Sequence, residues 1–158
     1  MSIAPLSAPA GDPWLQEPLD GVRLIEASAG TGKTFTLATL VTRLVVERDL
    51  RLAQVLAVTF TEAATQELRK RIRERLQLAL DLAGSAPADG EPAEAALTRA
   101  LLDGHRGCSG EPLHALRSRL RRAVDDIDLA AIFTIHGFCA RVLREHAQES
   151  GQGFDPPE

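Results

Sequence analysis

Residues 22–34 read VRLIEASAGTGKT, and this stretch decides the fold class. Residues 22–27 are apolar and β-prone over a short run, so they predict a strand. Gly30 and Gly32 break that pattern, and beyond them apolar residues recur at helical spacing. The helical set consists of Phe35, Leu37, Leu40, Val41, Leu44 and Val45. A strand, a glycine turn and a helix in this order are the setting that a phosphate-binding loop requires.

Residues 27–34, ASAGTGKT, carry most of the phosphate-loop pattern, although its first position holds Ala27 instead of glycine. Glycines let backbone N–H groups turn toward phosphate oxygens, and the helix that starts near Lys33 points its positive end at the same place. We expect Lys33 to reach the β- and γ-phosphates of ATP and the Thr34 hydroxyl to hold Mg²⁺. The alternative is a tight turn that binds nothing. The candidate ATP-binding residues are Ala27, Ser28, Ala29, Gly30, Thr31, Gly32, Lys33 and Thr34.

Two further apolar runs, residues 55–60 (VLAVTF) and 130–135 (AAIFTI), predict strands, and the first is apolar enough to be buried on both faces. Amphipathic helices are expected between and after the strands, one capped by Thr61 and another over residues 113–124. Residues 84–112 are rich in Gly and Pro and predict a surface insertion with a short helix over residues 93–102. Strands alternating with helices predict an α/β domain, a parallel sheet with flanking helices.

Polar and aromatic side chains follow two of these strands. Thr59, Phe60 and Thr61 come at the end of the first run, and His136 directly follows the second. Parallel strands end at the same edge of a sheet, so we expect these residues near the phosphate loop. Hydroxyl groups bind phosphates and an aromatic ring stacks on any base, which suits single-stranded DNA. The alternatives are a core role for Phe60, a structural role for His136, and a solvated helix face for the basic run 69–75.

Composition limits the class of protein. The chain has 158 residues, 44% of them hydrophobic and 25% charged, with a net charge of −4, which is typical of one globular domain and excludes a grossly basic nucleic-acid coat. Cys108 and Cys139 have neither a zinc nor a disulfide spacing. The sequence has no apolar run of about 18 residues and no secretory signal, so we expect a soluble cytoplasmic protein. Residues 1–18 are expected to be a mobile leader, and residues 19–158 the domain.

Three separated segments, ASAGTGKT, VTFTEAATQELRKRI and IFTIHGFCARVL, together resemble the superfamily 1 DNA helicases of the UvrD/Rep type. Over roughly residues 18–154 the chain is similar in particular to the N-terminal part of the exodeoxyribonuclease V beta-subunit family of helicase–nucleases. The resemblance implies the first part of a RecA-like P-loop NTPase motor domain, with ATP and Mg²⁺ at residues 27–34. It implies that Thr59, Phe60, Thr61 and His136 line the path of single-stranded DNA. It also implies double-stranded DNA as substrate, helicase–nuclease partner subunits, and a role in double-strand break repair and recombination.

The chain departs from this family pattern in two places. Such helicases often read adenine with a Gln just before the first strand, where this chain has Asp20 and Gly21, with Gln16 further back. ATP hydrolysis also needs a strand that ends in acidic residues, and the acidic residues of the segment 125–128 precede a strand instead. We therefore expect the opening segment of a larger enzyme, truncated before its Walker B motif, that alone neither hydrolyses ATP at a useful rate nor unwinds DNA.

Two other functions remain open from the residues. One is a small P-loop kinase or phosphotransferase, for which residues 117–122 (RSRLRR) resemble a lid, although a metal-holding carboxylate is missing. The other is a nucleotide-dependent DNA-binding module without catalysis. A filter-binding assay with single-stranded DNA separates the kinase from the other two.

Overall fold

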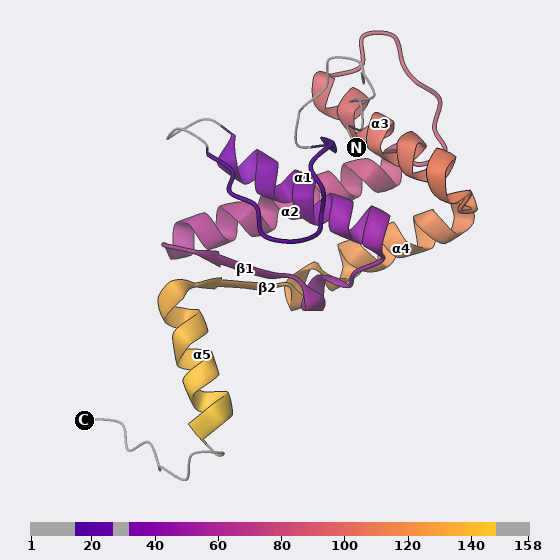
Figure 1. The fold of residues 1–158 in the computed structure, drawn as a ribbon. Helices are drawn as coiled ribbons and strands as arrows, with labels where there is room; N and C mark the ends of the chain where they lie inside the picture. The colour runs from indigo at the N-terminus through magenta and orange to yellow at the C-terminus, as the bar shows by residue number, and fades with distance from the viewer. Residues whose placement is uncertain (1–14, 27–31, 148–158) are drawn as a thin grey trace, which may run out of the picture.

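The computed structural model describes residues 15–26 and 32–147 (Figure 1). Within this part the chain is a mixed α/β fold of five α-helices and a parallel pair of strands. The elements in chain order are α1 (Lys33–Arg48), η2 (Leu52–Gln54), β1 (Leu56–Thr59), α2 (Glu62–Leu82), α3 (Ala93–Ser109), α4 (Leu113–Asp125), η3 (Asp126–Leu129), β2 (Ala131–Thr134) and α5 (Ile135–Ala147). The helices α1, α2, α4 and α5 and both strands confirm elements that the sequence pattern predicts.

Strands β1 and β2 pair in parallel, with Leu56 beside Ala131 at one end and Thr59 beside Thr134 at the other. Both strands are short because η2 and η3 precede them and α2 and α5 follow them almost at once. In Figure 1 the helices α1 to α4 lie on one side of the strands, and α5 extends away on the other. The parallel pairing confirms the expected sheet topology for these two strands.

Helices α1 to α4 bury one face of the strand pair, and on the other face Phe133 of β2 packs beside Phe138 and Arg141 of α5 (Figure 1). Ile132 and Thr134 are buried, and Ala57 packs against the core, whereas Leu56 and Val58 remain 52% and 43% exposed. The expectation that residues 55–60 are buried on both faces is therefore wrong, because helices α1 to α4 all pack on the same side (Figure 1). Side chains on the outer face alternate with those on the inner face, as the pleat of a strand requires.

The core lies between α1, α2 and α4. Helix α2 contacts α1, α4, α3 and both strands, so it is the central element. Thr61 ends the loop after β1 by accepting a hydrogen bond at Oγ1 from the Ala64 backbone N–H, 3.0 Å away, as its predicted capping role requires. The fully buried apolar side chains of the core include Ala38, Val45, Val46, Ile72, Leu76, Ala79, Leu116 and Leu120.

The strand predicted over residues 22–27 is not formed. Residues 22–26 have no regular structure, and Val22 and Leu24 are 95% and 87% exposed, while Ala27 lies outside the described residues. A strand forms only beside a neighbour that satisfies its backbone N–H and C=O groups. In the described part of the chain no strand lies next to this segment. Its β-prone composition is therefore not enough to make it a strand here.

Helix α3 is longer than predicted and is not merely a surface insertion. It runs from Ala93 to Ser109, past the residue where the pattern predicts its end, and includes Gly104 and Gly107. Each interior glycine costs up to about 1 kcal/mol relative to alanine. Leu101 and Leu102 are buried and α3 packs against α2, so tertiary contacts extend the helix beyond its local preference.

Replacing Leu76 by alanine should destabilise the fold strongly, because the side chain is fully buried at the centre of α2. Removal of such a leucine costs about 2–5 kcal/mol in the free energy of unfolding. Leu143→Ala is the matched control, since Leu143 is 65% exposed, and we expect a change within about 0.5 kcal/mol. Urea denaturation followed by circular dichroism measures both, and equal losses would contradict the assignment of the core.

Candidate functional site

The start of α1 presents the part of the predicted phosphate loop that the structure describes. Five of the predicted phosphate-loop residues lie outside the described residues, namely Ala27, Ser28, Ala29, Gly30 and Thr31. Gly32 stands immediately before the helix with φ 74°, a left-handed conformation that favours glycine. Lys33 and Thr34 open the helix, with Lys33 exposed and Thr34 half-buried.

The amino end of α1 has the properties of an anion site. The first N–H groups of an α-helix have no acceptor within the helix, and their dipoles add to a partial positive charge. The first turn of α1 lies within the described residues and contains no acidic side chain. Lys33 adds a full positive charge there. The described residues therefore fit the phosphates of a nucleotide, and the Thr34 hydroxyl is of the type that binds a magnesium ion.

Helix α1 begins on the side of the molecule toward which both strands run (Figure 1). The carboxyl ends of β1 and β2 meet there, because Thr59 lies beside Thr134 in the parallel register. The start of α1 and the strand ends thus lie on the same side of the fold (Figure 1), which is the side where open parallel sheets bind ligands.

Phe60 leaves β1 at this edge with 85% of its surface exposed. Ile135, the residue after β2, is 41% exposed, and His136 is exposed in the first turn of α5. The exposure of Phe60 argues against the core role that was its alternative, since core aromatics bury most of their surface. The register brings an exposed aromatic ring, an exposed aliphatic side chain and an imidazole to one edge, although they come from distant parts of the sequence.

The threonine hydroxyls at this edge hold the strand ends in place. Thr59 Oγ1 lies 2.6 Å from Thr65 Oγ1 and donates to the Phe133 carbonyl at 3.4 Å, so it joins β1, α2 and β2. Thr134 Oγ1 accepts from the Gly137 backbone N–H at 3.1 Å at the start of α5. Thr59 and Thr61 thus have structural hydrogen bonds besides any ligand contact. Sequence reasoning placed Thr134 at a strand end but missed its capping role, which its three-residue spacing to Gly137 indicates, and it missed Thr65.

The basic run 69–75 does not form a single solvated face. Lys70 and Arg71 are exposed and pair with acidic residues of their own helix. Arg69 donates to the Ile127 carbonyl at 3.1 Å and Arg73 binds Asp128 at 2.9 Å, so both tie α2 to η3 just before β2. Arg75 is buried, with a side-chain exposure of 2%. Three arginines of this run therefore stabilise the fold.

The segment 117–122 is likewise engaged within the fold. Arg117 donates to the Ala83 carbonyl, Arg119 to the Val46 carbonyl, and Arg119 and Arg122 both bind Asp49. These contacts lie near the carboxyl ends of α1 and α2, where helix carbonyls need donors. The kinase interpretation needs these arginines to close over a phosphoryl group, so the structure removes its main support.

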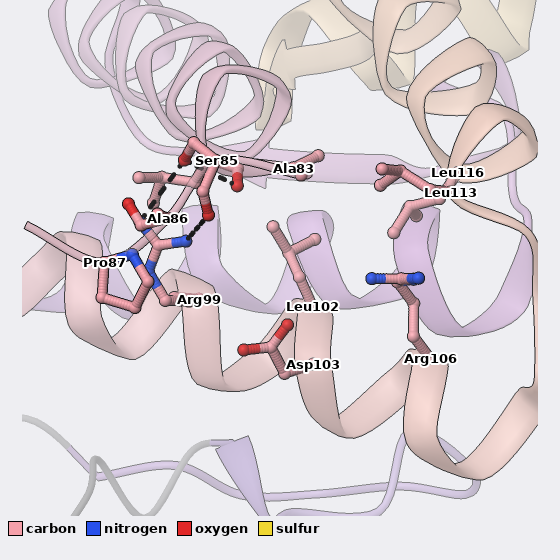
Figure 2. Close-up of a pocket in the computed structure, with 12 residues that line it drawn as sticks. Ala83, Ser85, Ala86, Pro87, Arg99, Leu102, Asp103, Arg106, Leu113 and Leu116 are labelled. Atoms are coloured by element: carbon pink, nitrogen blue, oxygen red, sulfur yellow. Dashed lines mark hydrogen bonds between the residues drawn. The ribbon is translucent and has the colours of Figure 1, made fainter.

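A cavity of about 500 Å³ lies between the end of α2, α3 and the start of α4 (Figure 2). Arg99 lies at one side of the cavity and donates hydrogen bonds to the Glu91 carboxylate and to the Ser85 carbonyl. The hydrogen bond from Arg99 lowers the pKa of the Glu91 carboxyl. The cavity adjoins Leu82, at the opposite end of α2 from Thr61. Twenty-one helical residues separate the two ends by about 30 Å, so the cavity is not part of the strand edge.

Other kinds of site find no support in the described residues. Within them, no group of three or more His, Cys, Asp and Glu side chains is arranged to hold a metal ion. Cys108 and Cys139 are exposed and free. None of the helices in residues 15–26 and 32–147 combines the length and apolar character that crossing a bilayer needs.

This chain is similar in sequence to one family of helicase domains and to RecB subunits of several bacteria. The family described as UvrD/REP helicase N-terminal domain matches residues 14–156. The RecBCD enzyme subunit RecB of Escherichia coli (strain K12) is 43% identical over 149 residues, which cover 89% of this chain and 12% of that protein. RecB of Haemophilus influenzae is 41% identical over 145 residues, covering 87% and 12%. RecB of Mycobacterium tuberculosis is 45% identical over 122 residues, covering 77% and 10%. The chain thus spans 12% or less of the length of these relatives.

Proposed function

The chain belongs to the UvrD/REP helicase N-terminal domain family, and from this premise we propose that it is the part of an ATP-dependent DNA helicase that binds ATP and single-stranded DNA. The observation that carries this proposal is the arrangement at the strand edge. Helix α1 begins on the side where β1 and β2 end, and Phe60 is exposed there. In this proposal the strand pair is part of a RecA-like P-loop sheet.

ATP would bind through residues 27–34. The backbone of Gly32 and the first turn of α1 would supply N–H groups to phosphate oxygens, Lys33 would neutralise phosphate charge, and the Thr34 hydroxyl would be a ligand for the metal ion. The magnesium ion, when bound, screens the negative charge on the β- and γ-phosphates. The chain's own groups would bind and orient the nucleotide, and the acidic strand end that hydrolysis requires would come from elsewhere in the protein.

Single-stranded DNA would cross the strand edge. The Phe60 ring offers a face on which a base can stack irrespective of its identity. His136, in the first turn of α5, and the hydroxyl and backbone groups of Thr59 and Thr61 are suited to phosphates. Movement of bases past Phe60 when the motor lobes close and open would couple ATP use to translocation.

The wider role follows from the relatives. By analogy with the RecB subunits of RecBCD enzymes, we propose that the natural protein acts on double-stranded DNA ends with helicase–nuclease partner subunits, in repair and recombination in the cytoplasm. The nuclease activity would reside outside the residues described here. The alternative is a nucleotide-dependent DNA-binding module without catalysis. The same edge of the strand pair would bind DNA in such a module.

Lys33→Ala should abolish ATP binding in the natural full-length protein and leave the fold intact, because Lys33 is exposed at the candidate phosphate site. Lys70→Ala is the matched control, since Lys70 is the only other lysine of the chain and lies exposed on α2, paired with Glu74. Equilibrium dialysis with ATP and circular dichroism test the two variants. Equal ATP binding by Lys33→Ala and the unmodified protein would contradict the phosphate site.

Phe60→Ala should weaken binding of an oligothymidylate by the loss of one stacked base, about 1–3 kcal/mol or roughly 5- to 150-fold in Kd. Phe60→Trp retains an aromatic face and should keep the affinity. Fluorescence anisotropy at fixed ionic strength measures both, and the stability should be unaffected since the ring is exposed. If the alanine variant binds as tightly as the unmodified protein, Phe60 has no part in the DNA path.

A further inference from the structure

The guanidinium group of Arg75 joins three helices. It comes from the middle of α2, donates from Nη2 to Thr39 Oγ1 on α1 at 3.0 Å, and binds Glu94 on α3 at 2.9 Å. Its central carbon also lies 4.7 Å from the centre of the Phe35 ring on α1. The side chain is 2% exposed, so these contacts replace nearly all of its water.

A buried arginine of this kind needs partners that compensate for the loss of its hydration. Burying a positive charge is unfavourable unless partners compensate it, and here they are one hydroxyl, one ring face and one carboxylate. Among the described residues the buried Nε of Arg75 has no hydrogen-bond acceptor. Arg75 is therefore sensitive to small shifts of α1 against α2, because each compensating group has a narrow range of favourable geometry.

Arg75 links the start of α1, where the candidate phosphate site lies, to α2, whose own start lies next to Phe60. Phe35 and Thr39 lie in the first two turns of α1, immediately after Lys33 and Thr34. Thr39 Oγ1 also donates to the Phe35 carbonyl at 2.9 Å, so the ring and the hydroxyl move together. Helix α2 runs from Arg75 back to its capped start at Thr61, next to Phe60, about 20 Å away.

We propose that Arg75 is a positioning residue that couples the nucleotide end of α1 to the DNA end of α2. A displacement of the first turns of α1 on nucleotide binding moves Phe35 and Thr39 against the guanidinium group, and α2 carries the movement as a rigid rod to the strand edge. This inference rests on the proposed function. It goes beyond it by assigning the link between the two sites to one buried side chain that touches neither ligand.

The test compares Arg75→Met with Arg71→Met in the natural full-length protein. Methionine keeps a long apolar side chain and removes the charge and donors. Arg71 is an exposed arginine of the same helix that pairs with Glu67 and Glu74 of that helix. The readout is the ratio of ATP turnover with saturating single-stranded DNA to turnover without DNA. Affinities for ATP alone and for DNA alone, and the melting temperature, are measured alongside.

Arg75→Met should lower this ratio at least about fivefold, the lower end of typical coupling between two sites, while each separate affinity is retained. Arg71→Met should leave the ratio unchanged. Thr39→Val removes the acceptor on α1, and its effect should not add to that of Arg75→Met if both act through one contact. If Arg75→Met does not fold, Arg75→Lys and Thr39→Val carry the same comparison.

An unchanged ratio in the Arg75 and Thr39 variants, with only a lowered melting temperature, would overturn the inference and leave Arg75 as a structural residue. A proportional loss of both turnover rates would overturn it in the same way. The proposed function fails separately: in that case the unmodified protein itself shows no stimulation of ATP turnover by DNA.

Discussion

The parallel register of β1 and β2 is the constraint on which the rest of the structure depends. Because Thr59 lies beside Thr134, the chain leaves both strands at the same level, and Phe60 and Ile135, the next residue of each, lie at one edge. A slip of one residue would turn every side chain of a strand to the opposite face. Phe60 would then exchange its exposed position for one toward the helices, and the candidate DNA surface would be lost.

Arginine side chains of α2 bond to the elements next to this strand pair. Arg69 and Arg73 hold η3, which leads directly into β2, and Arg75 holds α1 and α3 against the same helix. Helix α2 is thus fixed to the nucleotide end of α1 and to the start of β2, while its own start follows Phe60. Charged donors make the stronger hydrogen bonds, which applies to Arg69 on its backbone carbonyl and to the buried Arg75, whereas the Arg73–Asp128 pair is exposed on both sides and contributes little.

Residue spacing and turn residues predicted most of the helices and both paired strands. Packing between elements decided the features that spacing alone does not predict. The helix after Gly32, the cap at Thr61 and the parallel strands follow from residue spacing and turn chemistry. The segment 22–26 carries the same kind of apolar signal, yet it has no neighbouring strand in the described residues and stays irregular. The contacts of the basic run were not predictable, because helical spacing shows which residues share a face but not which element packs against them. For the site, spacing predicted that the residues share an edge, and the exposure of Phe60 needed the structure.

Photo-crosslinking shows directly whether one DNA molecule passes across the carboxyl ends of both β1 and β2. A benzoylphenylalanine in place of Phe60 or of Ile135, in the natural full-length protein, is irradiated with a labelled single-stranded oligonucleotide, and the same group in place of Leu143 serves as the control. We expect crosslinks from positions 60 and 135 to neighbouring nucleotides of the same oligonucleotide, and none from position 143. Bound DNA that crosslinks to neither position at the strand edge would contradict this expectation.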